Sequence, residues 1–276
     1  MRWRGERQST NIEDRRGMRP AMVGGGLGAI ILTLIALYFG VDPGVIVNSS
    51  NPVADSSNAP VDDNARDFAS AVLGYTEDTW SDVFREAGKT YSPPKLVLFS
   101  GAVESACGLG QSAMGPFYCP NDQKVYLDMS FFRDLRNRFQ APGDFAEAYV
   151  IAHEVGHHVQ NLLGTARQVE AFQRRASKAD ANRASVALEL QADCFAGVWA
   201  NRTEKAQQAQ THQWLEAGDV DEALNAASAV GDDRLQMQAQ GYVIPESFTH
   251  GSAAERSKWF RTGMDSGSVS ACNTFQ

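Results

Sequence analysis

The sequence predicts a mainly helical α+β domain with a small sheet, preceded by one transmembrane helix. Three observations lead to this prediction. Apolar residues recur at helical intervals over most of the chain after residue 65, short β-rich runs occupy only 95–128, and 21–39 carries no charged side chain. The chain has 276 residues and a net charge of −8, which suits one sizeable domain.

The apolar segment 21–39 is the candidate membrane helix. Its length matches the roughly 20 residues that a helix needs to cross the apolar core of a bilayer. Six arginines precede it and the rest of the chain is acidic. The positive-inside rule therefore predicts that residues 1–20 are a cytoplasmic, poorly ordered basic tail, followed by a span over 21–40 and an exported body. A cleaved signal peptide is the alternative, but 36–40 offers no clean small-x-small cleavage site.

Residues 41–64 are rich in Asn, Ser, Asp and Pro and lack periodicity, which predicts a linker that holds the body away from a membrane. The body is expected over 65–276. An acidic chain without a dense stripe of Lys and Arg argues against nucleic acid as a partner. The oligomeric state cannot be predicted from these features.

The four cysteines suit an oxidising compartment. Cys107 and Cys119 flank a glycine-rich segment that a disulfide could close, and Cys194 and Cys272 then pair by default. A structural metal site made of cysteines is the competing interpretation, but the sequence has no C-x-x-C spacing. Two disulfides are therefore expected.

The body begins with a predicted helix from residue 65, whose large apolar residues should face the core. A strand is predicted over 95–103. Two further runs, 116–119 and 124–128, predict a strand pair joined by a turn. The segment 123–128 is either an inner strand or an edge strand that could pair with an extended ligand. A short helix over 131–139 follows.

The segment 144–163 is the predicted central helix. Asp144 and Glu147 form a start that is similar to a capping box, and Gly164 suits the end of the helix. Most of its residues are small or apolar, so the helix should be buried on most sides. The polar residues at 153–158 then need partners, because burying unpaired polar groups is costly.

His153-Glu-Val-Gly-His157 is an H-E-x-x-H motif. On a helix, positions i and i+4 share a face, so His153 and His157 can bind one metal ion. Glu154 then lies beside the open coordination position, where a general base is needed. The alternative is a pair of solvated or capped histidines. His158 points about 100° away from its neighbour His157 and is expected to pack instead.

The third metal ligand must come from elsewhere, because Leu163 occupies the position where one class of zinc peptidases has a third histidine. Glu189 and Asp193 lie four residues apart on a predicted, otherwise apolar helix. Glu189 is the expected ligand, and Asp193 is expected to accept the N–H of a ligand histidine. Glu170 and Asp180 are rivals in a more solvated region.

Two neutral imidazoles and one carboxylate leave a zinc site with net positive charge, which favours hydrolysis by an activated water. Glu154 is expected to take the proton of that water and to deliver it to the leaving amine. His250 and Arg256 flank a short turn, and both are candidates for stabilising the oxyanion. The segment 211–240 is predicted to be helical with a break at 231–233, and no chemical role is expected for it.

Several motifs in fixed order resemble the bacterial neutral zinc metallopeptidase family. They are H-E-V-G-H-H-V-Q-N-L-L-G from residue 153, E-L-Q-A-D-C-F-A-G from 189, G-D-D-R-L-Q from 231, and T-H-G-S from 249 with Trp259 and Phe260. The resemblance covers about 65–275. It implies a zincin-like domain that binds one zinc ion (Zn²⁺) per chain, and it implies no particular substrate.

The E-x-x-A-D element also resembles the CAAX-type and heat-shock zinc peptidases of membranes, in which the first Glu is the third metal ligand. This resemblance supports Glu189. Those enzymes also have a His and an Arg six residues apart, as His250 and Arg256 are here, although Gly251 stands where they have a proline. The chain lacks their several membrane spans, so its active site is expected in a soluble domain.

These features predict a zinc endopeptidase of the gluzincin type, anchored in the bacterial inner membrane with its catalytic body on the periplasmic side. Its expected partner is a protein or peptide substrate. The alternatives are a catalytically silent, zinc-stabilised binding module and an amidase that acts on cell-wall peptides. Glu154 favours an enzyme, because a scaffold needs the metal ligands but not the base.

Overall fold

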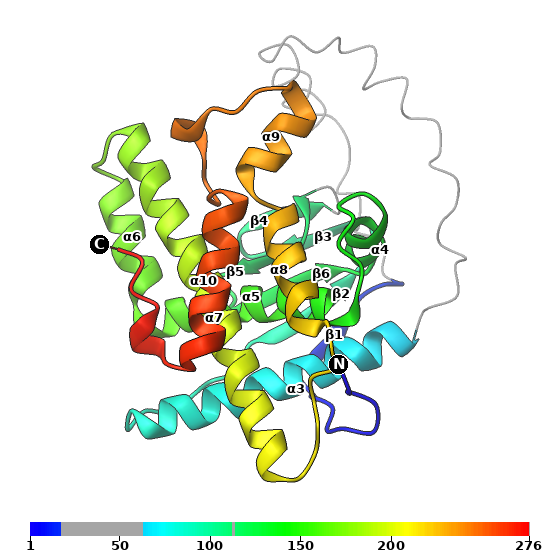
Figure 1. Cartoon of the computed structure of the whole chain (residues 1–276). Coiled ribbons are helices and arrows are strands. Elements are labelled where there is room, and N and C mark those ends of the chain that lie inside the picture. Colours follow the sequence, from blue (N-terminus) through cyan, green and yellow to red (C-terminus); the bar gives the residue numbers. More distant parts are fainter. Residues whose placement is uncertain (18–62, 112–113, 276) are drawn as a thin grey trace.

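The computed structural model describes residues 1–17, 63–111 and 114–275 (Figure 1). They form a mainly helical α+β fold with a small mixed sheet, as the sequence predicts. The predicted membrane span over 21–40 and nearly all of the predicted linker over 41–64 lie outside the described residues. Among the helices that are described, none has both the length and the apolar character needed to cross a membrane.

A four-stranded sheet lies beside the helices, and a separate two-stranded hairpin adjoins it. In spatial order the sheet contains β1 (Ile12–Asp14), β2 (Lys95–Phe99), β6 (Lys124–Asp128) and β5 (Phe117–Cys119), and the hairpin contains β3 (Ala102–Ser105) and β4 (Gly108–Gln111). Strands β1, β2 and β6 are parallel, and β5 is antiparallel to β6. The predicted strand over 95–103 therefore ends at Phe99, and its last residues begin β3.

The strand pair expected on either side of 120–123 is present as β5 and β6. Strand β6 lies between β2 and β5, so 123–128 is an inner strand and the edge-strand alternative is wrong. Its residues Val125, Tyr126 and Leu127 are buried whichever face they point to, as expected for a strand covered on both sides. Among the described strands, β5 forms the edge on this side of the sheet.

Eight α-helices are described, with two short 3-10 helices near the C-terminus. They are α3 (Asp63–Glu86), α4 (Ser130–Asn137), α5 (Asp144–Leu163), α6 (Thr165–Gln173), α7 (Lys178–Ala209), α8 (Asp219–Ala229), α9 (Asp232–Gln240), η3 (Pro245–Ser247), α10 (Ala253–Ser266) and η4 (Val269–Ala271). The central helix α5 has the predicted bounds, and Gly164 ends it in a left-handed conformation with φ 83°. The N-cap of α5 is Gly143, without a side-chain cap, so the expected capping box is absent.

Helix α5 lies at the centre of the fold, where it contacts α3, α7, α8 and the strands β5 and β6 (Figure 1). Gly156 permits a close approach to α7, because a Cβ atom at this position would lie 3.0 Å from the carbonyl oxygen of Ala192. Helix α10 packs against α7 and α8 on the side away from the sheet. The face of α5 that carries the H-E-x-x-H motif is thereby held against α7.

Residues 1–17 pack into the body, so the expectation of a poorly ordered tail is wrong for them. Strand β1 pairs with β2, and Met1 is buried. The amino group of Met1 donates hydrogen bonds to Asp144 at the start of α5 and to Asp219 at the start of α8. Arg7 binds two carboxylates of α3. The sequence suggested a solvated tail because the acidic partners of these arginines are far away in the chain, so the ion pairs that hold the tail are not visible in the local sequence.

Both expected disulfides are present. Cys107 pairs with Cys119 and joins the β3–β4 hairpin to the end of β5. Cys194 pairs with Cys272 and joins α7 to the segment after α10. The second bridge spans 78 residues of sequence, so it ties the C-terminal segment to the helix that carries Glu189.

Candidate metal centre

Three residues bring potential metal ligands together between α5 and α7. One side-chain atom each of His153, His157 and Glu189 lies within 4.8 Å of the others. Nε2 of His153 lies 3.1 Å from one carboxylate oxygen of Glu189, and Nε2 of His157 lies 3.4 Å from the other. The spacing of four residues places both histidines on the face of α5 that meets α7. The arrangement matches the ligand set predicted from the sequence.

Both imidazole rings are oriented by hydrogen bonds on their other nitrogen. Nδ1 of His153 lies 2.8 Å from a carboxylate oxygen of Asp193, and Nδ1 of His157 lies 2.9 Å from the side-chain oxygen of Gln160. Since these oxygens accept hydrogen bonds, Nδ1 carries the proton and Nε2 offers its lone pair to a metal. Asp193 thus makes the predicted contact. Gln160 was missed, although its position three residues after His157 on one helix could have indicated it.

Asp193 is fully buried and joins a network behind His153. Arg256 binds its carboxylate in a two-pronged contact, with Nε 2.8 Å from one oxygen and Nη2 2.9 Å from the other. The hydroxyl of Tyr149 donates to the same carboxylate. This pairing satisfies a negative charge that would otherwise be costly in the core.

Arg256 therefore lies on the Nδ1 side of His153, whereas the nitrogen of that ring that faces Glu189 is Nε2. Its side chain is only 5% exposed. The structure thus does not support the oxyanion role expected for Arg256. The physical reason is that α10 begins at Ala253 and directs Arg256 into the core, toward α7.

The charges of the site favour a cation between the imidazoles. Burial alone would lower the pKa of His153, but the negative charge of Asp193 and the hydrogen bonds to Asp193 and Glu189 raise it to about 10. Burial would raise the pKa of Asp193, but Arg256 and His153 lower it to about 2. Burial would likewise raise the pKa of Glu189, and the two histidines hold it well below its ordinary value. A divalent metal ion fits this surplus of negative charge.

Glu154 follows the first ligand and is buried, with 8% of its surface exposed. Its carboxylate has no hydrogen-bond partner among the described residues. The pKa of His157 is raised. Burial lowers it, but the charge of Glu189 and, to a smaller degree, that of Glu154 raise it. Glu154 is therefore close to the site, and its oxygens are available to accept a proton.

His250 lies on the turn before α10, with 52% of its side chain exposed. Its Nδ1 is 3.3 Å from a carboxylate oxygen of Asp232. The hydrogen bond with Asp232 is the main reason that the pKa of His250 is raised, and the charge of Glu189 adds to this effect. Gly251 has φ 92°, a value that the proline of the similar membrane enzymes cannot adopt.

The remaining candidates are structural. His158 is fully buried, where Nε2 donates to the carbonyl oxygen of Ser92 and Nδ1 accepts from the Tyr118 hydroxyl. It packs away from the metal ligands, as expected. The rival ligands Glu170 and Asp180 form exposed ion pairs with arginines three or four residues along the chain. Neither belongs to the candidate metal centre.

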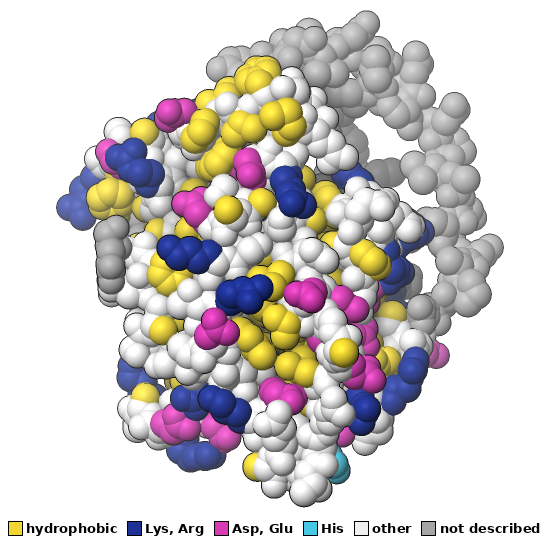
Figure 2. Space-filling model, in the orientation of Figure 1, with side chains coloured by type: hydrophobic (Ala, Val, Ile, Leu, Met, Phe, Trp, Pro, Cys, Tyr) yellow, Lys and Arg dark blue, Asp and Glu magenta, His cyan; other side chains and the backbone are white. Residues whose placement is uncertain are grey.

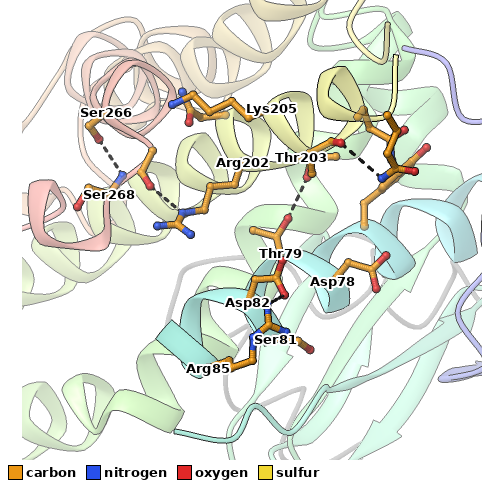
Figure 3. Close-up of a pocket in the computed structure, with 16 residues that line it drawn as sticks. Asp78, Thr79, Ser81, Asp82, Arg85, Arg202, Thr203, Lys205, Ser266 and Ser268 are labelled. Atoms are coloured by element: carbon orange, nitrogen blue, oxygen red, sulfur yellow. Dashed lines mark hydrogen bonds and ion pairs between the residues drawn. The ribbon is translucent and has the colours of Figure 1, made fainter. Parts of the chain in front are cut away.

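Two hollows lie outside the ligand cluster. The first, of about 810 Å³, lies between α3, α7 and the end of α10, and a hydrogen bond joins the Thr79 and Thr203 hydroxyls in its wall (Figure 3). The second, of about 1250 Å³, runs along α6 and α7 and includes Leu190, the neighbour of Glu189. Exposed apolar side chains gather over α9 and the loop that follows it (Figure 2).

The chain is similar to known proteins over its whole length. Residues 1–275 match the family described as "Putative neutral zinc metallopeptidase". The chain is 50% identical to protein YpfJ of Escherichia coli K12 over 289 residues, which covers 100% of this chain and 99% of YpfJ. It is 40% identical to protein Rv2575 of Mycobacterium tuberculosis H37Rv over 253 residues, with 87% and 85% of the two chains covered. No solved structure matches the chain.

The family match confirms the resemblance found in the motifs and extends it to the N-terminus. The motifs covered about 65–275, whereas the match begins at residue 1. This agrees with the packing of residues 1–17 against the body.

Proposed function

Because the chain belongs to the neutral zinc metallopeptidase family, we propose that it is a zinc-dependent endopeptidase that hydrolyses peptide bonds of proteins or peptides. The observation that carries the proposal is the cluster of His153, His157 and Glu189 with Glu154 beside it. Two imidazoles and one carboxylate are a ligand set of catalytic zinc sites, which leave a fourth position for water or substrate. One zinc ion per chain would occupy this site.

In the proposed reaction, zinc supplies a Lewis acid that polarises the peptide carbonyl and acidifies water. Glu154 takes a proton from the attacking water and delivers it to the leaving amine. Its available carboxylate supports this role. Asp193 and Gln160 keep the two imidazoles in the orientation that directs Nε2 at the ligand cluster. His250 donates from Nε2 to the developing oxyanion, and its exposed ring and raised pKa support that role.

Replacement of Glu189 by Ala should remove bound zinc, because it takes away one of three ligands and the only carboxylate among them. The loss of affinity should exceed the roughly 10–100-fold that removal of a supporting residue causes. Zinc per chain after dialysis, measured by mass spectrometry of the metal, tests this. Glu170→Ala is the matched control, since Glu170 is an exposed carboxylate outside the site. Equal zinc content in Glu189→Ala and the wild type would contradict the ligand assignment.

Digestion tests the proposed substrate class. Wild-type enzyme with zinc should cut labelled casein, whereas exclusive release of amines from cell-wall peptides would favour the amidase. A zinc-loaded protein that cuts neither substrate would favour the silent binding module.

We also propose that the body lies outside the cytoplasm. The two disulfides support this location, because such bonds persist in oxidising compartments. Alkylation of whole cells with a thiol reagent before lysis should leave all four cysteines unlabelled, as read by mass spectrometry. Labelling of most chains at Cys107 or Cys194 would instead indicate a reducing compartment. The membrane anchor over 21–40 stays a prediction.

A further inference from the structure

Asp232 is the first residue of α9, in a segment for which the sequence suggested no chemistry. One oxygen of its carboxylate accepts the backbone N–H groups of Thr249 at 2.7 Å, of His250 at 2.7 Å and of Gly251 at 3.1 Å. The other oxygen lies 3.3 Å from Nδ1 of His250. In return, the backbone N–H of Asp232 donates to the carbonyl oxygen of Gly251 at 2.9 Å. A single side chain thus holds the whole turn that carries His250.

We infer that Asp232 is a positioning residue for His250, which holds the turn against the ligand helix and binds Nδ1 so that Nε2 faces the substrate. This inference rests on the proposed peptidase function. The side chain of Asp232 is 12% exposed, so its hydrogen bonds are largely protected from competing water. Among the described residues, Nε2 of His250 has no partner, and it is therefore free to meet a substrate group.

The position of the turn beside the metal centre follows from Gly251. A Cβ atom on Gly251 would lie 3.1 Å from the side chain of Leu190 and 3.3 Å from that of Val186. These two residues flank Glu189 within one turn of α7. The turn thus rests on the ligand helix on one side and is bound to α9 by Asp232 on the other. Two anchors of this kind fix His250 relative to the metal ligands.

The charges around His250 come from three helices. Asp232 on α9 and Glu189 on α7 are negative, and Arg256 on α10 is positive. The hydrogen bond with Asp232 contributes most to raising the pKa of His250, burial lowers it, Glu189 raises it and Arg256 lowers it. The pair therefore favours an imidazolium, which donates from both nitrogens and suits an oxygen that becomes negatively charged.

The neighbouring Asp233 offers a matched control. Its carboxylate accepts the backbone N–H of Ala253 at 2.8 Å, at the start of α10, and has no contact with His250. Replacing either aspartate by asparagine removes one charge and keeps an oxygen that can accept backbone hydrogen bonds. Only Asp232→Asn removes the charge that faces the imidazole.

The first test needs no activity. In the full-length, zinc-loaded protein, the imidazole pKa of His250 is measured by NMR titration, with the signal assigned from its loss in His250→Ala. Asp232→Asn should lower this pKa, and Asp233→Asn should leave it unchanged. An unchanged pKa in Asp232→Asn would overturn the inference.

The second test uses a quenched fluorescent peptide that the wild type cuts. His250→Ala should lower kcat by roughly 10²–10³-fold, as loss of one oxyanion donor does, and Asp232→Asn should lower it at least about tenfold, both with KM, zinc content and Tm near those of the wild type. In the His250→Ala background, Asp232→Asn should have no further effect on kcat. Additive losses would overturn the inference.

The two proposals fail in different ways. A zinc-loaded wild type that cuts no peptide would count against the proposed function, and the titration of His250 would still decide whether Asp232 controls this residue. An active wild type with an unaffected Asp232→Asn variant would leave the peptidase standing and reject the positioning role.

Discussion

Glu154→Gln should abolish peptide hydrolysis while the protein keeps its zinc. The amide preserves the size of the side chain but cannot accept the proton of the attacking water, so kcat should fall on the order of 10²–10⁴-fold. Zinc content should stay near that of the wild type, because His153, His157 and Glu189 remain. The measurement is hydrolysis of a quenched fluorescent peptide together with zinc per chain.

A matched control is Glu170→Gln, which makes the same chemical change at an exposed ion pair on α6. It should alter neither activity nor zinc content. Hydrolysis by Glu154→Gln at the wild-type rate would mean that another group is the base. Zinc loss in this variant would mean that Glu154 contributes to binding the metal.

Arg256→Met should destabilise the fold more than any exposed charge change in the chain. Asp193 is fully buried, and without the guanidinium its carboxylate would keep only its contacts with His153 and Tyr149. Removing one partner of a buried ion pair lowers the free energy of unfolding by about 3–5 kcal/mol. Urea unfolding of the oxidised protein measures this loss. Zinc affinity should also fall, since Asp193 orients His153.

Two comparisons make this result specific. Arg174→Met removes an exposed pair with Glu170 and should cost less than about 1 kcal/mol. The double variant Asp193→Asn with Arg256→Met should recover part of the lost stability, because it removes the uncompensated charge. If Arg256→Met instead kept its stability and its zinc but lost kcat, the oxyanion role expected from the sequence would be right.

The parts of the site that lie within one helix could be predicted from the sequence. The spacing of His153 and His157 fixes a common face of α5, and the spacing of Glu189 and Asp193 does the same on α7, because helical geometry is local. The contact between α5 and α7 followed from chemistry, because a metal ion bound by two histidines needs a third protein ligand. The contact between Gln160 and His157 could also have been predicted from their spacing of three residues, but a glutamine near a histidine is not a recognised motif.

The parts that depend on contacts between distant segments could not be predicted. Asp232 is 18 residues from His250, and only the fold shows that its carboxylate meets that turn. Arg256 follows His250 by six residues, yet the start of α10 turns it into the core. The order of strands in the sheet, which makes β6 an inner strand, is likewise a property of long-range pairing that no local pattern encodes.

The packing of residues 1–17 constrains the topology of the chain. Met1 touches the starts of α5 and α8, and β1 is part of the sheet, so both flanks of 18–62 belong to one folded body. Two segments that share a hydrophobic core must share one aqueous compartment. Met1 and Asp144, which form an ion pair, therefore lie in the same aqueous compartment.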